Sequence, residues 1–125
     1  MQHSADSPLF TTRIAVVEGD RSTAEMLHMF FRLMEFEIAL AAADFSAIDT
    51  IRRVAPAVVL LDLDLPNLRA LELAREIRAS CEGVGIIFMT SGDGLEAPEG
   101  AIVVPKPAQR FEELLSLFEV VLEQC

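Results

Sequence analysis

Five short, mostly apolar runs recur along the chain, at residues 13–17, 37–41, 57–61, 86–90 and 101–104. The third run is the most continuous, because five apolar residues precede Asp62. Continuous apolar runs of this length are typical of strands that are buried on both faces of a parallel sheet. We therefore expect five strands, with the run at 57–61 near the centre of the sheet.

Apolar residues at helical spacing separate these runs, over residues 22–34, 45–54, 68–79 and 110–124. The Ser-Thr-Ala-Glu sequence at 22–25 is a capping-box pattern and predicts the start of the first helix. Its apolar face is broad, because Met29 and Phe31 flank the stripe that contains Leu27, Phe30 and Leu33. A broad face is either additional core or a docking surface.

The segment 91–100 interrupts this alternation, because it holds Gly92, Gly94, Gly100 and Pro98 within ten residues. Glycine and proline oppose helix formation, and a full crossover with its helix normally needs at least about 10–12 residues. We expect the fourth helix to be missing or about one turn long. Strands that alternate with helices predict an α/β fold, with a parallel sheet covered on both sides.

Composition is that of one small domain of 125 residues, with a flexible lead-in at 1–12 and the folded domain at 13–125. The net charge of −10 argues against direct binding of nucleic acid or anionic membranes and favours cationic partners, including metal ions. Two cysteines without metal-binding spacing, no apolar run near 20 residues and no leader signal predict a cytoplasmic protein that contacts no membrane.

Polar residues follow the predicted strands at their carboxyl ends: Glu18 and Asp20, Asp62, Thr90 and Lys106. In a parallel sheet these ends meet at one edge, where ligands of α/β proteins bind. Neighbouring carboxylates repel each other unless a cation neutralises them, and Mg²⁺ suits carboxylate and phosphate oxygens. Lys106 and Thr90 offer a positive charge and a hydroxyl donor to a phosphoryl group, and a carboxylate can accept that group covalently.

Four sequence motifs together resemble the receiver domain of two-component response regulators, over about residues 13–124. They are Val16-Val17-Glu18-x-Asp20, Leu60-Leu61-Asp62-x-Asp64-x-Pro66, Thr90-Ser91 and Lys106-Pro107. The resemblance implies a flavodoxin-like (CheY-like), doubly wound five-stranded parallel sheet with strand order 2-1-3-4-5. The short fourth-to-fifth-strand connection is similar to that of a divergent receiver subgroup.

The resemblance also implies roles for individual residues. Asp62 corresponds to the phosphoacceptor, Thr90 to the switch hydroxyl and Lys106 to the lysine that contacts the phosphoryl group. Glu18 corresponds to the first acidic residue that holds Mg²⁺. Asp64 is expected to be a solvated turn residue that ligates the metal through its backbone.

One departure concerns the metal. Gly19 stands where a second acidic residue usually ligates Mg²⁺ directly, which places the Mg²⁺ cofactor in doubt. Asp20 or Glu18 is the candidate substitute. Val103 replaces the usual switch aromatic of the fifth strand.

The function implied is acceptance of a phosphoryl group on Asp62, with Mg²⁺, from a histidine kinase or phosphotransfer protein, which switches a partner interaction. Such a receiver is not an enzyme and assists only its own phosphorylation and dephosphorylation. Leu117 and Val120, off the core face of the last helix, suggest a homodimer through that helix and the fifth strand.

Two alternatives stay open. One is a pseudo-receiver, a protein-interaction module that does not use phosphorylation, which Gly19 favours. The other is a flavodoxin-like cofactor binder or small enzyme. It is disfavoured because no Gly-rich loop follows the first strand and the chain has neither Trp nor Tyr.

Overall fold

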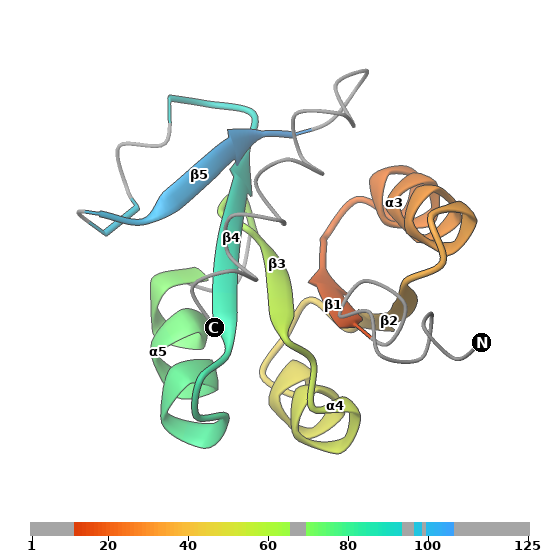
Figure 1. Cartoon of the computed structure of the whole chain (residues 1–125). Helices are drawn as coiled ribbons and strands as arrows, with labels where there is room; N and C mark the ends of the chain where they lie inside the picture. Colours follow the sequence, from red (N-terminus) through yellow and green to blue (C-terminus); the bar gives the residue numbers. More distant parts are fainter. Residues whose placement is uncertain (1–11, 66–69, 94–96, 99, 107–125) are drawn as a thin grey trace.

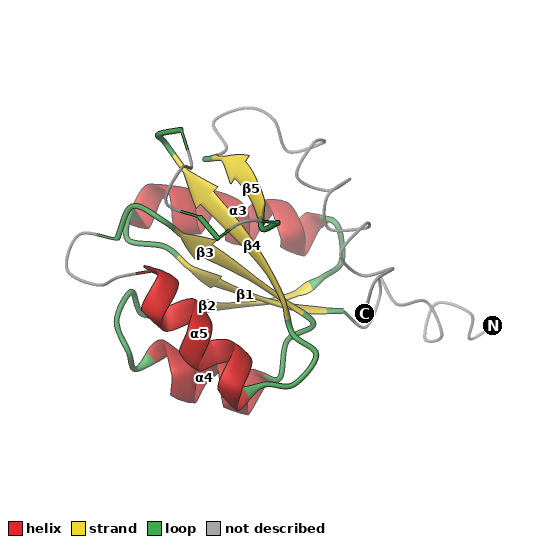
Figure 2. Cartoon of the chain, turned by 90° about the vertical axis from the view of Figure 1, so that its left-hand side faces the viewer, coloured by secondary structure: helices red, strands yellow, loops and turns green. Residues whose placement is uncertain are grey.

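A five-stranded parallel sheet forms the centre of the computed structural model, which describes residues 12–65, 70–93, 97–98 and 100–106. The strand order is β2-β1-β3-β4-β5, as predicted. The strands are β1 (Arg13–Val17), β2 (Glu37–Ala41), β3 (Val58–Asp62), β4 (Gly85–Thr90) and β5 (Ile102–Pro105), and the described helices are α3 (Arg21–Leu33), α4 (Ala47–Val54) and α5 (Ala70–Ser80). Helix α3 lies on one side of the sheet, and α4 and α5 lie on the other (Figures 1 and 2).

Strand β3 is the central strand because its sequence is apolar on both faces. All five of its residues are buried, and it pairs with β1 on one edge and β4 on the other. Val59, for example, lies between Ala15 of β1 and Ile86 of β4. Asp62 is therefore the last residue of the most enclosed strand.

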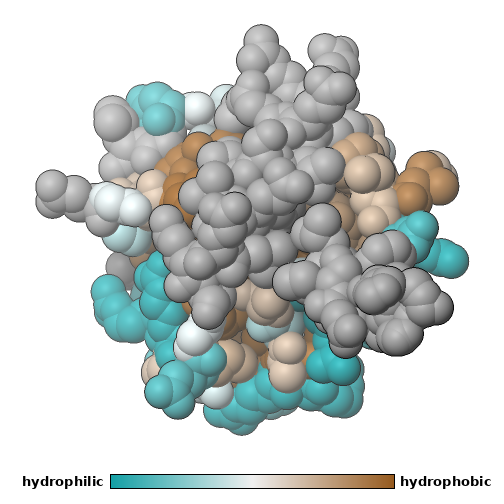
Figure 3. Space-filling model, in the orientation of Figure 1, coloured by the Kyte–Doolittle hydropathy of each residue, from teal (hydrophilic) through white to brown (hydrophobic). Residues whose placement is uncertain are grey.

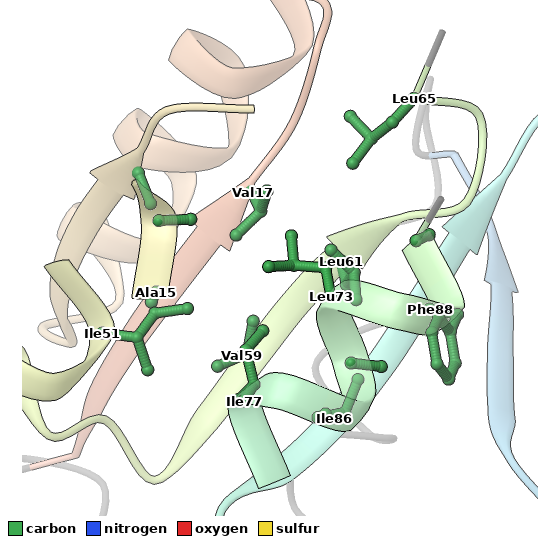
Figure 4. Close-up of a cluster of buried hydrophobic side chains, with 14 residues drawn as sticks. Ala15, Val17, Ile51, Val59, Leu61, Leu65, Leu73, Ile77, Ile86 and Phe88 are labelled. Atoms are coloured by element: carbon green, nitrogen blue, oxygen red, sulfur yellow. The ribbon is translucent and has the colours of Figure 1, made fainter. Parts of the chain in front are cut away.

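Alternate residues of the strands point into two separate apolar layers. Val58 and Leu60 pack with Phe31 of α3 on one face. Val59 and Leu61 pack on the opposite face with residues of α4 and α5, including Ile51 and Ile77 (Figure 4). The outer surface over α4 and α5 is mainly hydrophilic (Figure 3, lower part). The sheet is thus anchored from both sides, which fixes where its carboxyl edge lies.

Helix α3 starts two residues earlier than the capping box predicts, because Asp20 and not Ser22 is its N-cap. The helix begins at Arg21, and Asp20 is its N-cap, with a carboxylate that accepts a hydrogen bond from the Thr23 N–H at 3.0 Å. The core face also differs from the predicted stripe, because Phe31 is fully buried whereas Leu33 is 75% exposed. An aspartate N-cap explains the first difference, since its carboxylate reaches the free N–H groups of the first turn.

The connection from β4 to β5 contains no helix among its described residues, 91–93, 97–98 and 100–101. This agrees with the predicted loss of the fourth helix. Residues 1–11 of the predicted lead-in at 1–12 lie outside the described residues, as does the predicted last helix at 110–124 with its proposed dimer surface. Within the described part of the chain, every helix is too short or too polar to span a membrane.

Candidate functional site

Four strand ends deliver polar side chains to the same edge of the sheet. Glu18 directly follows β1, Asp62 ends β3, Thr90 ends β4, and Lys106 directly follows β5. Backbone hydrogen bonds continue the ladder past the strands, because the Lys106 N–H donates to the Thr90 carbonyl at 2.8 Å. The site is therefore built on the rigid sheet, as predicted from the strand ends.

Lys106 is the shared counter-ion of three carboxylates. Its Nζ lies 3.1 Å from Glu18 Oε2, 3.1 Å from Asp62 Oδ1 and 3.5 Å from Asp64 Oδ2. Burial disfavours the charged lysine, but hydrogen bonds to Asp62 and Glu18 outweigh it and raise the pKa of Lys106. The ammonium group is thus held at the centre of an anionic cluster.

Asp62 is held in one orientation by two backbone donors. The side chain is 2% exposed. Oδ1 accepts the Asp64 N–H at 2.8 Å, and Oδ2 accepts the Gly19 N–H at 3.2 Å. The two N–H donors and Lys106 therefore surround a buried carboxylate at the end of β3, and a carboxylate can serve as a nucleophile.

Glu18 carries an unpaired buried oxygen. Oε2 accepts the Asp20 N–H at 2.9 Å and faces Lys106, but Oε1 is buried and has no hydrogen-bond partner among the described residues. Burial and then the neighbouring Asp62 raise the pKa of Glu18 to about 7. An unsatisfied carboxylate oxygen beside a second carboxylate fits a hard divalent cation, which takes oxygen ligands.

Asp20 lies outside this cluster of carboxylates. Its Oδ2 accepts both the Thr23 N–H at 3.0 Å and the Thr23 hydroxyl at 2.6 Å, so the carboxylate caps α3. Across the described ranges, no group of three or more Asp, Glu, His or Cys side chains is arranged to hold a metal ion. A cation here would rely on Glu18 and Asp62, supplemented by backbone, water or phosphoryl oxygens. The roles of Asp20 and of the Asp64 backbone as metal ligands stay predictions.

Asp64 is the functional side chain whose position the sequence did not indicate. Its side chain is 30% exposed and turns into the site rather than into solvent. Oδ1 accepts the Thr90 hydroxyl at 3.0 Å, and Oδ2 accepts the Ser91 N–H at 2.8 Å and the Ser91 hydroxyl at 2.9 Å. Although burial opposes it, these donors and Lys106 lower the pKa of Asp64. The signal available in the sequence was the pair of hydroxyl residues at the end of β4, Thr90 and Ser91.

Mycobacterial response regulators are among the relatives that match this chain. The DNA-binding response regulator MtrA of Mycobacterium tuberculosis (strain ATCC 25618 / H37Rv) is 38% identical over 79 residues, which are 63% of this chain and 34% of MtrA. The response regulator MprA of Mycobacterium sp. (strain KMS) is 29% identical over 118 residues, which are 90% of this chain and 51% of MprA. The chain thus spans about a third to a half of the length of these relatives.

Solved receiver structures share the fold. The chemotaxis protein CheY4 of Vibrio cholerae superposes with a TM-score of 0.78 at 20% identity, over 89% of this chain and 98% of CheY4. At that identity the likeness concerns the fold alone, and it supports the CheY-like arrangement of sheet and helices.

The net charge led us to expect no direct contact with nucleic acid, and that expectation is wrong. It rested on the net charge of −10 of these 125 residues, whereas MtrA is a DNA-binding response regulator. The charge of one domain says nothing about DNA contacts made by other parts of a longer regulator, because electrostatic attraction acts locally in salt.

The family comparison agrees with the geometry of the strand ends. The family model of the response regulator receiver domain matches residues 14–104, which cover all of β2, β3 and β4 and all but one residue each of β1 and β5. The matched range also contains Glu18, Asp62, Asp64 and Thr90. The buried aspartate at the end of β3 and the lysine after β5 occupy the positions that the four sequence motifs predicted. The chain belongs to the response regulator receiver domain family.

Proposed function

We propose that this receiver accepts a phosphoryl group on Asp62 from a histidine kinase or phosphotransfer protein, with Mg²⁺. The observation that carries the proposal is the setting of Asp62, which is buried at the end of β3 with Lys106 Nζ 3.1 Å from its Oδ1. Glu18 adds a buried, unpaired oxygen beside it. Asp62 thus supplies a nucleophile, Lys106 a positive charge, and the carboxylates of Glu18 and Asp62 a place where a cation could bind.

The protein residues act mainly by position and charge. The Gly19 and Asp64 N–H groups orient the Asp62 carboxylate, and Lys106 places a positive charge where phosphoryl oxygens would arrive. Phosphoryl transfer needs little covalent chemistry from the protein beyond the nucleophile, so orientation and neutralisation account for most of the rate.

Glu18 and Asp62 are the residues that would hold the metal ion. When bound, Mg²⁺ supplies positive charge that neutralises the carboxylates and the incoming phosphoryl oxygens. Gly19 provides no side chain for this purpose, and Asp20 is engaged at the start of α3. We therefore expect weaker Mg²⁺ binding than a site with three acidic side chains would give.

The wider role we propose is that of a cytoplasmic signalling switch. Phosphorylation of Asp62 changes an interaction with a partner, and the protein assists only its own phosphorylation and dephosphorylation. Similarity to MtrA, which is named as DNA-binding, supports a DNA-binding effector as the partner under control.

One observation favours the pseudo-receiver as the second candidate function. Gly19 stands at the position of the second metal-binding acid, and the carboxylate of the next residue, Asp20, accepts two hydrogen bonds from Thr23. A receiver without effective metal binding would act as an interaction module that does not depend on phosphorylation.

Intact-mass spectrometry after incubation with phosphoramidate and Mg²⁺ tests the proposal. We expect one phosphoryl adduct on the wild type and none on Asp62→Asn or in excess chelator. Asp49→Asn, an acidic residue of α4 outside the site, serves as the charge-matched control and should be labelled normally.

The outcome separates the two candidates. If the wild type gains no phosphoryl adduct although circular dichroism shows that it is folded, the pseudo-receiver is favoured. If Gly19→Asp then restored the adduct, the missing metal ligand would be the cause.

A further inference from the structure

The carboxylate of Asp64 accepts hydrogen bonds from groups that we expect to donate to an incoming phosphoryl group. Thr90 Oγ1 donates to Asp64 Oδ1 at 3.0 Å, the Ser91 N–H donates to Oδ2 at 2.8 Å, and Lys106 Nζ lies 3.5 Å from Oδ2. These donors come from the ends of β4 and β5, beside Asp62. Asp64 is thus an anion placed within the donor set expected to receive phosphoryl oxygens.

The Thr90 hydroxyl and the Ser91 N–H cannot serve both anions at once. A threonine hydroxyl has one hydrogen; Thr90 gives it to Asp64, while its oxygen accepts the Gly92 N–H at 2.9 Å. The Ser91 N–H is likewise a single donor. A phosphoryl group on Asp62 would also bring negative charge next to the Asp64 carboxylate, and like charges at short range repel strongly in a partly buried site.

We propose that Asp64 is an internal competitor of the phosphoryl group, and that its carboxylate must leave Thr90 and Ser91 before Asp62 is phosphorylated. The inference rests on the proposed function of Asp62 as phosphoacceptor. Asp64 thereby slows phosphorylation and holds Thr90 in the unphosphorylated protein much as a phosphoryl oxygen would. Asp64 is a positioning residue, because it forms no bond to phosphorus.

The transfer itself balances without Asp64. A bond forms between a carboxylate oxygen of Asp62 and phosphorus while the bond from phosphorus to the donor nitrogen breaks. The electron pair of that bond leaves with the nitrogen, which takes up a proton from solvent. Asp64 rotates toward water, and the Thr90 hydroxyl and Ser91 N–H then donate to phosphoryl oxygens.

The test compares initial rates of phosphorylation of wild type, Asp64→Asn and Asp64→Ala by phosphoramidate with Mg²⁺. Asn keeps the size of the side chain without its charge, and Asp49→Asn controls for the change in net charge. We expect labelling of Asp64→Ala to be about tenfold faster than that of wild type, because an anion no longer has to leave its hydrogen bonds. If Asp64 merely supported the structure of the loop, its removal would slow labelling.

A second measurement follows binding of beryllofluoride, a phosphoryl mimic, through the NMR shift of the Ser91 amide. Tighter binding by both Asp64 variants supports the inference. If the Asp64 variants are labelled no faster than wild type, or bind the mimic no more tightly, the inference about Asp64 is overturned. Labelling of wild-type Asp62 would still support the proposed function. If Asp62 is labelled in no protein, the proposed function fails, and the mimic measurement alone decides the inference.

Discussion

At the scale of single residues, the site depends on one lysine that neutralises three acids. Lys106 contacts Glu18, Asp62 and Asp64, and the first two are almost completely buried. Removing one partner of a buried ionic cluster leaves charge without compensation, which costs much more than loss of an exposed pair. Lys106 should therefore contribute to stability as well as to phosphoryl binding.

Replacing Lys106 with Met should lower the free energy of unfolding at pH 7 by about 2 kcal/mol. We expect less than for a fully buried pair, because the lysine side chain keeps 21% exposure. Urea denaturation without divalent cations measures the change. Arg21→Met is the matched control: its ion pair with Glu25 is exposed, so its loss should cost about 0.5 kcal/mol. Equal losses in both variants would show that burial of the Lys106 cluster is irrelevant.

The site could be predicted from sequence only as far as backbone geometry determines it. Parallel strands bring Glu18, Asp62, Thr90 and Lys106 to one edge whatever their rotamers, so their meeting was foreseeable. The directions of Asp20 and Asp64 depend on local donors instead. Each rotates toward a nearby N–H and hydroxyl of Thr23 or Ser91, and the order of residue types did not rank those competing partners.

At the scale of elements, the first helix shows where apolar periodicity is insufficient. The apolar residues of this helix form a broad face, but only Leu27 and Phe31 of the α3 residues are fully buried. Periodicity locates an apolar arc, whereas the contact with Phe36 and with strands β1 and β3 selects the part of it that is buried. A broad arc therefore could not show which of its residues form the core.

Phe31→Ala should destabilise the protein by about 3–5 kcal/mol, because it leaves a large cavity between α3 and the sheet. Phe31 packs edge-to-face against both Phe30 and Phe36, which adds to the loss. Leu33→Ala, on the same helix but 75% exposed, should change stability by less than about 0.5 kcal/mol. Thermal and urea unfolding would measure both. A large effect at Leu33 would mean that its side chain is covered in solution.

The start of α4 should make stability depend on pH through Asp44. Its carboxylate accepts hydrogen bonds from the N–H and hydroxyl of Ser46, and these bonds lower the pKa of Asp44 below 3.8. A lowered pKa in the folded state stabilises the protein above the unfolded value of 3.8, and this contribution disappears as the pH falls through the folded pKa.

We therefore expect Asp44→Ala to be less stable than wild type at pH 7, with the difference shrinking below pH 3.8. Denaturant titrations at pH 7 and pH 3 would measure it. Asp49→Ala is the charge-matched control: it removes an equal charge from α4, where Asp49 forms an exposed pair with Arg52 at 3.9 Å. A difference for Asp44→Ala that stayed constant down to pH 3 would contradict the role of its ionised form.

At the scale of the whole molecule, the sheet converts distant parts of the sequence into one site. The strand order brings the carboxyl ends of β1, β3, β4 and β5 to one edge. Glu18 after β1 and Lys106 after β5, which are 88 positions apart, thus come within 3.1 Å. The resemblance to receiver domains implied this strand order, and the alternation of strands and helices predicted the parallel sheet on which it depends.

The overall charge of −10 means that any cation stabilises the folded chain somewhat by screening, so a specific Mg²⁺ effect needs a matched comparison. A ligand that binds only the folded state adds about 1.4 kcal/mol at ten times its dissociation constant. We expect Mg²⁺ to raise the unfolding free energy more than NaCl of equal ionic strength, and Glu18→Gln to abolish that excess. Asp44→Asn, with the same charge change outside the site, should retain it. If NaCl matched Mg²⁺ in wild type, the unpaired oxygen of Glu18 would not be a cation ligand, and the Mg²⁺-dependent mechanism would lose its structural basis.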